Sequence, residues 1–140
     1  MKRKMPHLDV KKLKVGVNVL TKGVYVYKKL RNAICQMYLP EGTKVVRTVG
    51  SEATTKYRAD KAIIVMIVPF TSEGWGHRTF KKYSSLRNKS AFNLNPGHGQ
   101  DRIYKLGKTI MPSYWLNENP NNDCASGIYF WETLQKAEQY

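Results

Sequence analysis

Residues 62–70, with the sequence AIIVMIVPF, are the longest apolar stretch of the chain. A lysine precedes this stretch, and Pro69 interrupts it after seven residues. Such a short run without charge, rich in β-branched side chains, favours a strand buried on both faces over a helix. The run is about half as long as a membrane-spanning helix requires. We therefore expect a strand at the centre of a globular core and no association with a membrane.

The sequence on both sides of this run has the features of further strands. Apolar residues alternate with polar ones, and Gly, Pro and Asn separate the segments. The last residues are rich in Gln, Lys, Ala and Glu, which favour a terminal helix. The predicted class is α+β, mostly antiparallel strands with a short C-terminal helix. The expected strands are 15–20, 23–27, 33–39, 44–49, 62–68, 102–104, 108–111 and 127–131, and the expected helix is 133–140.

Two segments fall outside this pattern. Residues 1–14 are predicted to form a basic N-terminal arm, in which Pro6 disfavours an early helix. Residues 71–100 are rich in Ser, Asn and Gly with scattered aromatic residues, and they are predicted to form a long basic loop. Loops of that length in compact domains are usually functional or disordered. We therefore expect a single domain over residues 15–140, preceded by the arm.

The charge balance is the most unusual property of the composition. The 140 residues include 24 Lys and Arg but only 10 Asp and Glu, which gives a formal net charge of +14. An excess of this size favours an acidic partner, because the partner relieves repulsion among the basic groups. Residues 1–31 carry net +9, residues 32–100 carry +6 and residues 101–140 carry −1. The first two-thirds is therefore the expected electrostatic face, and the last third is expected to be scaffold or a different surface.

The arm and the predicted loop carry the candidate nucleic-acid-binding residues. Basic side chains neutralise phosphates, and aromatic faces stack on bases. No helix-turn-helix, zinc finger or RNA-binding signature is visible, so we expect binding with little sequence preference. The alternative is that both segments are ordinary solvated surface. The candidates are Lys2, Arg3, Lys4, Lys11, Lys12, Lys14, Trp75, Arg78, Lys81, Lys82, Tyr83, Arg87 and Lys89.

Several motifs resemble those of a known viral domain. The segments are YKLGKTIMP at 104–112, NP at 119–120, CASGIYF at 124–130, AEQY at 137–140 and, upstream, KYRA at 56–59 followed by Ala62. Together they resemble the uncharacterised domain that accompanies pentapeptide repeats in large DNA viruses and phages. Tyr57 and Tyr129 stand where that domain usually has Cys and His. The resemblance covers residues 33–68 and 102–140, and no pentapeptide-repeat array is present.

This resemblance implies a setting rather than a chemistry, because no activity is established for that domain. It suggests a small basic virion protein of a giant virus of the marseillevirus type. The implied location is the virion and the host cytoplasm or nucleus.

Enzymatic alternatives have weaker support. The string at 127–130 also resembles the tyrosine motif of ADP-ribosyltransferases, and His98-Gly99 lies 129 − 98 = 31 residues upstream of Tyr129. The glutamate that those enzymes place well downstream is not found before Tyr140, so only a degenerate domain of that kind is conceivable. The three His and the two Cys have no metal-ligand spacing. We expect no enzymatic activity, no metal and no cofactor.

The expected function is therefore that of a non-enzymatic protein that binds nucleic acid, most readily DNA. The alternative is a protein-interaction module or a homodimeric structural protein, whose basic surface binds an acidic partner.

Overall fold

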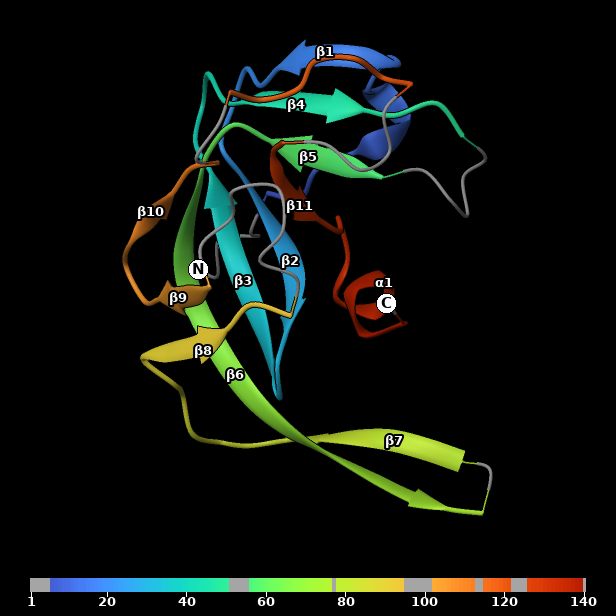
Figure 1. Cartoon of the computed structure of the whole chain (residues 1–140), viewed down its shortest axis with the longest axis vertical. Coiled ribbons are helices and arrows are strands. Elements are labelled where there is room, and N and C mark those ends of the chain that lie inside the picture. The colour runs from blue at the N-terminus through green and yellow to red at the C-terminus, as the bar shows by residue number, and fades with distance from the viewer. Residues whose placement is uncertain are drawn as a thin grey trace.

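The computed structural model of the chain describes residues 6–50, 56–76, 78–94, 102–112, 115–121 and 126–139. For Trp75, Arg78 and Thr79 only the backbone is described. Strands make up most of the regular structure (Figure 1). The elements are η1 (Val10–Lys12), β1 (Gly16–Val19), β2 (Val24–Leu30), β3 (Ala33–Leu39), β4 (Lys44–Arg47), β5 (Tyr57–Ala59), β6 (Ala62–Trp75), β7 (Arg78–Tyr83), β8 (Ser90–Phe92), β9 (Ile103–Lys105), β10 (Thr109–Ile110), β11 (Ile128–Phe130) and α1 (Leu134–Gln139).

The apolar run at 62–68 forms the first half of β6, inside a sheet with the order β10-β6-β3-β2. Ala62, Ile64 and Ile67 face the core, whereas the residues between them are half-buried. The expectation that both faces of this strand are buried was therefore wrong. The register against β3 shifts between Gln36 and Met37, and this bulge moves the core-facing positions from even to odd numbers.

A second antiparallel sheet, with the order β1-β4-β5-β11, lies across the upper end of the first (Figure 1). Its buried residues belong to the same apolar cluster as those of β2, β3 and β6. The two sheets are joined where Trp131, directly after β11, bridges Tyr27 in β2. The core therefore lies between the two sheets.

The region predicted to be a long basic loop contains strands instead. β6 continues to Trp75 and pairs with β7, which makes a hairpin that projects from the lower end of the molecule (Figure 1). The sequence did not predict this hairpin, because polar residues dominate it and polar hairpins show little hydrophobic alternation. Further along the same region, β8 pairs with β9.

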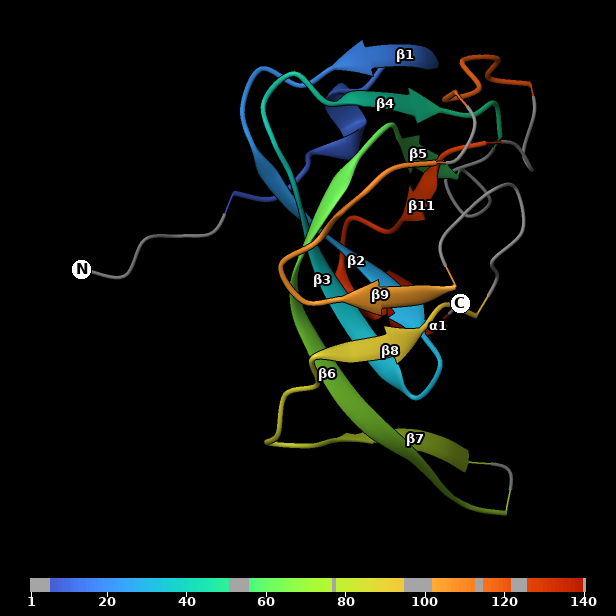
Figure 2. The same ribbon diagram turned by 60° about the vertical axis from the view of Figure 1, so that its left-hand side comes forward.

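The β8–β9 ribbon crosses in front of β3 and β6 (Figure 2). Tyr104 on β9 is fully buried in the core, and Ala91 on β8 packs against it. Because successive side chains of a strand point to opposite faces, the residues before and after Ala91 and Tyr104 lie on the outer, solvent-exposed face. These residues are Ser90, Phe92, Ile103 and Lys105. The ribbon thus covers the core on one side and exposes its other side to solvent.

Both ends of the chain are attached to the sheets. Leu8 is buried in the core, and Arg47 on β4 donates hydrogen bonds to the carbonyl oxygens of Val10 and Leu13. The segment from residue 6 to residue 14 is therefore packed against the domain rather than free of it. At the other end, Ala137 on α1 is buried against Ile34 and Phe70, on the outer face of the first sheet.

The class of the fold agrees with the prediction in its main feature, which is antiparallel strands with a short C-terminal helix. Within the described residues, no helix has the length and apolar character of a membrane span.

Candidate nucleic-acid interface

The outer face of the β8–β9 ribbon combines basic and apolar side chains. Phe92 pairs with Ile103 across the ribbon, and both are exposed, Phe92 by 58%. Backbone hydrogen bonds extend the pairing at both ends, from Asn93 to Arg102 and from Leu106 to Lys89. We call this face, together with the exposed residues Lys89 and Arg102 that flank its strands, the basic ribbon, and it consists of Lys89, Ser90, Phe92, Arg102, Ile103 and Lys105.

The surroundings of the basic ribbon are strongly positive. The described segments 84–94 and 102–112 contain five basic residues and no acidic one. Arg87, Lys89, Arg102, Lys105 and Lys108 are all exposed. Cations at this spacing on a solvated strand pair are suited to the phosphates of an extended chain. The ribbon and the segments that flank it therefore form a cation-rich surface without acidic residues in the described ranges 84–94 and 102–112.

Three of these five cations come from residues 101–140, which we expected to be scaffold or a different surface. Residues 101–140 carry a net charge of −1, because acidic residues elsewhere in the segment cancel the charges of Arg102, Lys105 and Lys108. The pairing of β9 with β8 places Lys105 opposite Ser90, close to Lys89, and places Arg102 at the other end of the ribbon, opposite Asn93. The net charge of a long segment averages over all its residues, whereas strand pairing decides which individual side chains lie next to one another. A search for alternation in 102–105 could have found the outward positions.

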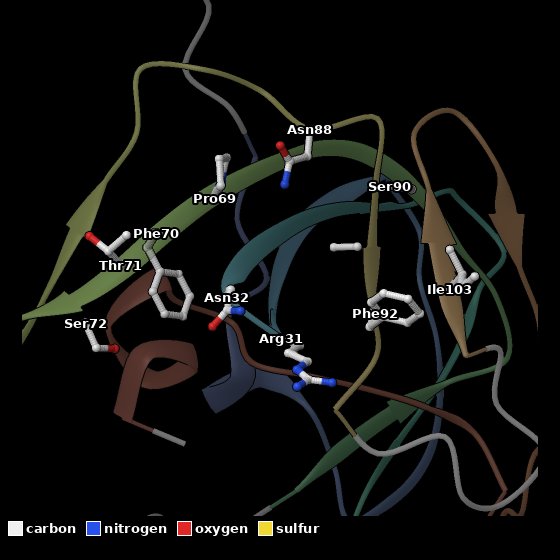
Figure 3. Close-up of a pocket in the computed structure, with 11 residues that line it drawn as sticks. Arg31, Asn32, Pro69, Phe70, Thr71, Ser72, Asn88, Ser90, Phe92 and Ile103 are labelled. Atoms are coloured by element: carbon white, nitrogen blue, oxygen red, sulfur yellow. The ribbon is translucent and has the colours of Figure 1, made fainter.

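A cavity of about 560 Å³ opens beside the ribbon, at the base of the hairpin (Figure 3). Four segments form its walls: the turn between β2 and β3, the middle of β6, the strand β8 with Asn88 before it, and the first residue of β9. The wall is chemically mixed, with two phenylalanine rings, one guanidinium group, and several hydroxyl and amide groups. The lining residues are Arg31, Asn32, Pro69, Phe70, Thr71, Ser72, Asn88, Ser90, Ala91, Phe92 and Ile103.

Local backbone geometry places the polar groups of this cavity. Arg31 and Asn32 are the two turn residues between β2 and β3, and Asn32 takes a φ of 57°, which asparagine tolerates better than most residues. The Arg31 N–H donates to the Phe92 carbonyl at 2.9 Å, which ties the turn to β8. Figure 3 shows the Arg31 guanidinium below the Phe92 ring and the Asn88 amide directed toward the cavity.

The hairpin residues predicted to bind nucleic acid do not act together. Lys81 and Tyr83 face α1, where the Lys81 ammonium donates to the Glu138 carbonyl and the Tyr83 hydroxyl donates to the Glu138 carboxylate. The Lys81 ammonium also lies 5.5 Å from the Phe70 ring centre. Burial and the Glu138 carboxylate raise the pKa of Tyr83 above its ordinary value. These two side chains therefore hold the helix rather than present a free surface.

The other predicted residues are dispersed. Lys82 is exposed on β7, and Arg87 is exposed but donates to the carbonyl oxygens of Ser84, Ser85 and Leu86. Trp75 and Arg78 pair at the end of the hairpin, and their side chains lie outside the described part, as do Lys2, Arg3 and Lys4. Of the whole predicted set, Lys89 alone belongs to the basic ribbon, with Arg87 two residues before it. Exposed residues of the N-terminal segment, Lys11, Lys12 and Lys14, lie near β1 and β4 at the other end of the molecule (Figure 1).

Two other basic residues are not part of the exposed surface charge and instead donate hydrogen bonds to backbone carbonyl oxygens. Arg58 on β5 is fully buried, and its guanidinium donates to the carbonyl oxygens of Asn117 and Asn119 at 2.8 Å each. Gly127 passes so closely over Arg58 that a Cβ atom at residue 127 would lie 2.9 Å from the Arg58 Cβ. Residues 56–59, 119–120 and 127–130, quoted above as a resemblance, therefore meet around one buried guanidinium.

Lys28 on β2 is the second interior cation. Its ammonium donates to the Tyr129 carbonyl at 3.0 Å and lies about 6 Å from the ring centres of Tyr104 and Tyr129. Burial lowers the pKa of Lys28 to about 8. Burial also raises the pKa of the thiol of Cys35, its cross-strand neighbour, to about 12. At neutral pH this thiol is protonated, so it is a poor nucleophile.

The described residues contain no group of three or more His, Cys, Asp or Glu side chains arranged to bind a metal ion. His77, His98 and Cys124 lie outside the described residues. Tyr129, which the comparison with ADP-ribosyltransferases singled out, is a half-buried residue of β11 whose carbonyl binds Lys28.

Comparisons with known proteins yield one assignment. No curated protein and no solved structure matches the chain. A family model, described as a family of unknown function (DUF5758), matches residues 15–137, which include both sheets, the hairpin and the basic ribbon. The chain therefore belongs to the family of unknown function DUF5758.

Proposed function

We propose that this protein binds nucleic acid, DNA in the first place, through phosphate contacts that depend little on sequence. It acts as a binding protein and not as an enzyme. The observation that carries the proposal is the basic ribbon, where exposed cations surround an exposed aromatic ring. Lysine and arginine displace the counterions of phosphates, and an aromatic side chain adds stacking.

The net charge of the whole chain supports the same conclusion. A formal charge of +14 attracts a polyanion at long range and accelerates its association. The resemblance in residues 33–68 and 102–140 adds a viral setting to the proposal, in which the protein packages, protects or organises viral DNA in the virion or the infected host cell.

Binding of fluorescein-labelled duplex and single-stranded oligonucleotides, measured by anisotropy from low to high salt, tests this proposal. The logarithm of the affinity should fall linearly with the logarithm of the salt concentration, by about 0.9 per phosphate neutralised on duplex DNA. A variant with Lys89, Arg102 and Lys105 changed to Gln should lose up to about three phosphate contacts from this slope.

The matched control changes Lys11, Lys12 and Lys14 to Gln, which removes the same amount of charge from the other end of the molecule. If the control weakens binding as much as the ribbon variant, the ribbon is not the site. Negligible binding by the wild type at low salt would overturn the proposal itself.

A protein partner is the second candidate, and one observation favours it. Trp115 is 94% exposed and Met111 is 61% exposed, which is unusual for large apolar side chains that have no partner. A saturable complex with an acidic protein, or a homodimer, that survives high salt and is lost in Trp115→Ala would support this role. Binding that disappears steeply with salt would favour nucleic acid.

A further inference from the structure

We infer that the cavity beside the basic ribbon receives one unstacked base of single-stranded nucleic acid, while the ribbon holds the neighbouring phosphates. This inference rests on the proposed function and adds to it the strandedness of the ligand and the site of a base. Its starting point is the volume of the cavity, about 560 Å³. This value lies within the roughly 300–1,000 Å³ that is usual for small-molecule sites.

The cavity wall offers both kinds of contact that a base requires. A base has a flat aromatic face and an edge with hydrogen-bond donors and acceptors. Phe92 supplies a ring, and Asn88, Ser72 and Ser90 supply amide and hydroxyl groups that both donate and accept. Because these groups can pair with a hydrogen-bond donor or with an acceptor on the edge of the base, the site has no built-in preference for one base.

Of the two phenylalanine rings, Phe92 is the one free to stack. Phe70 is only 7% exposed, since it packs edge-on against Tyr83 and under the Lys81 ammonium. Phe92 is 58% exposed, and its backbone is anchored on both sides by pairing with Ile103 and by the Arg31 N–H. An exposed ring on an anchored backbone is an arrangement that single-strand-binding proteins use for base stacking.

The distribution of charge favours a polymer over a free nucleotide. Arg31 is the single charged residue among those that line the cavity. The other cations follow the ribbon: Lys105 is the cross-strand partner of Ser90, and Arg102 precedes Ile103. Cross-strand partners have Cβ atoms about 5 Å apart, so Lys105 lies directly beside the cavity wall. Phosphates on either side of a bound base would therefore meet separate cations.

Strandedness follows from the same geometry. In a duplex the bases are stacked and paired inside the helix, and removing one costs a few kcal/mol. A single strand presents its bases without that cost. A site that gains affinity from an inserted base therefore prefers single strands, whereas the cations of the ribbon alone would bind either form.

The test measures the affinity of the full chain for a fluorescein-labelled oligothymidylate of about 12 nucleotides. The comparison ligands are an abasic oligonucleotide of the same length, which keeps the phosphates and lacks bases, and a duplex of the same length. We expect the oligothymidylate to bind at least about fivefold more tightly than the abasic strand, since stacking contributes about 1–3 kcal/mol per base. Phe92→Ala should remove this difference, and Phe92→Trp should retain it.

Trp115→Ala, which removes an exposed aromatic residue that does not line the cavity, is the matched control and should leave the difference intact. Equal binding of the abasic strand and the oligothymidylate would overturn the base site while the proposed function stands. Equal affinity for thymidine monophosphate and the oligothymidylate would overturn the inference that the ligand is a polymer. Failure of every strand to bind at low salt would instead refute the proposed function.

Discussion

Two regions of the molecule use basic side chains in opposite ways. Arg58 is fully buried and Lys28 is half-buried, and both donate to backbone carbonyl oxygens of the segments that follow β10. On the basic ribbon, Lys89, Arg102 and Lys105 are exposed to solvent. The interior pair connects parts of the chain that are 59 to 101 residues apart, whereas the ribbon residues face outward from a two-stranded surface.

The difference teaches that net charge alone does not identify a binding surface. A buried cation needs hydrogen-bond acceptors to offset its desolvation, so its position follows from the fold. An exposed cation has no such requirement and remains available to a ligand. The comparison predicts that interior substitutions change stability, and that exterior substitutions change binding.

The largest expected effect is that of Arg58→Ala on stability. This substitution leaves the carbonyl oxygens of Asn117 and Asn119 without their donors and removes a buried side chain beneath Gly127. We expect the free energy of unfolding in urea to fall by about 4 kcal/mol. Arg102→Ala, the exposed control, should change it by less than about 0.5 kcal/mol.

Arg58→Lys adds a second readout if the alanine variant does not fold. Lysine keeps the charge but cannot donate to two carbonyl oxygens in the planar arrangement of a guanidinium, so an intermediate loss is expected. Equal stability of the Arg58 and Arg102 variants would contradict the interior assignment.

The next effect concerns the pH dependence of stability and depends on Lys28. The pKa of Lys28 is about 8 in the folded state against an ordinary value of 10.5, so the unfolded chain binds more protons between these values. The contribution of Lys28 to the free energy of unfolding should therefore rise between pH 8 and 10.5, by about 3 kcal/mol. Lys28→Met should lack this contribution.

The measurement is the difference in unfolding free energy between wild type and Lys28→Met, followed from pH 7 to 10.5. The comparison of two variants matters because Cys35 acts in the opposite direction. Its pKa is about 12 when folded and 9.0 ordinarily, so deprotonation in the unfolded chain lowers stability above pH 9. A difference that stays flat across this range would show that the Lys28 ammonium is solvated.

The smallest effect separates two neighbouring lysines on the hairpin. Lys82 is exposed, whereas the Lys81 ammonium is held by the Glu138 carbonyl and the Phe70 ring. Lys82→Gln should lower the salt slope of DNA binding by up to about one phosphate contact and leave stability unchanged. Lys81→Gln should instead cost up to about 1 kcal/mol of stability with an unchanged slope. The reverse pattern in anisotropy and urea titrations would contradict the assignment of Lys81 to stability and of Lys82 to binding.

Much of the strand pattern was predictable from local sequence. The predicted strand 33–39 matches β3, and the predicted strands at 15–20, 23–27, 44–49 and 62–68 each overlap an observed one. These segments alternate or concentrate β-branched residues between turn residues, which is a local signal. The β6–β7 hairpin carried no such signal, because most of its residues are polar and its strands project beyond the core.

The basic ribbon was less accessible to prediction from the sequence. Runs of Lys and Arg drew attention to 1–14 and 78–89, yet Lys81 and Tyr83 pack on α1 and the ribbon takes three of its six members from 102–105. The cavity joins residues 31–32, 69–72, 88, 90–92 and 103, which no pattern along the chain connects.

The sequence by itself thus determined the β-rich class, the terminal helix and the excess of positive charge. These properties depend on composition and on periodicities of a few residues, which are local. The tertiary structure alone decided which cations are buried, which are exposed to solvent, and where an aromatic ring lies beside a cavity. The physical reason is that strand pairing brings residues together across long separations, and burial then requires a hydrogen-bond acceptor for each cation that the core encloses.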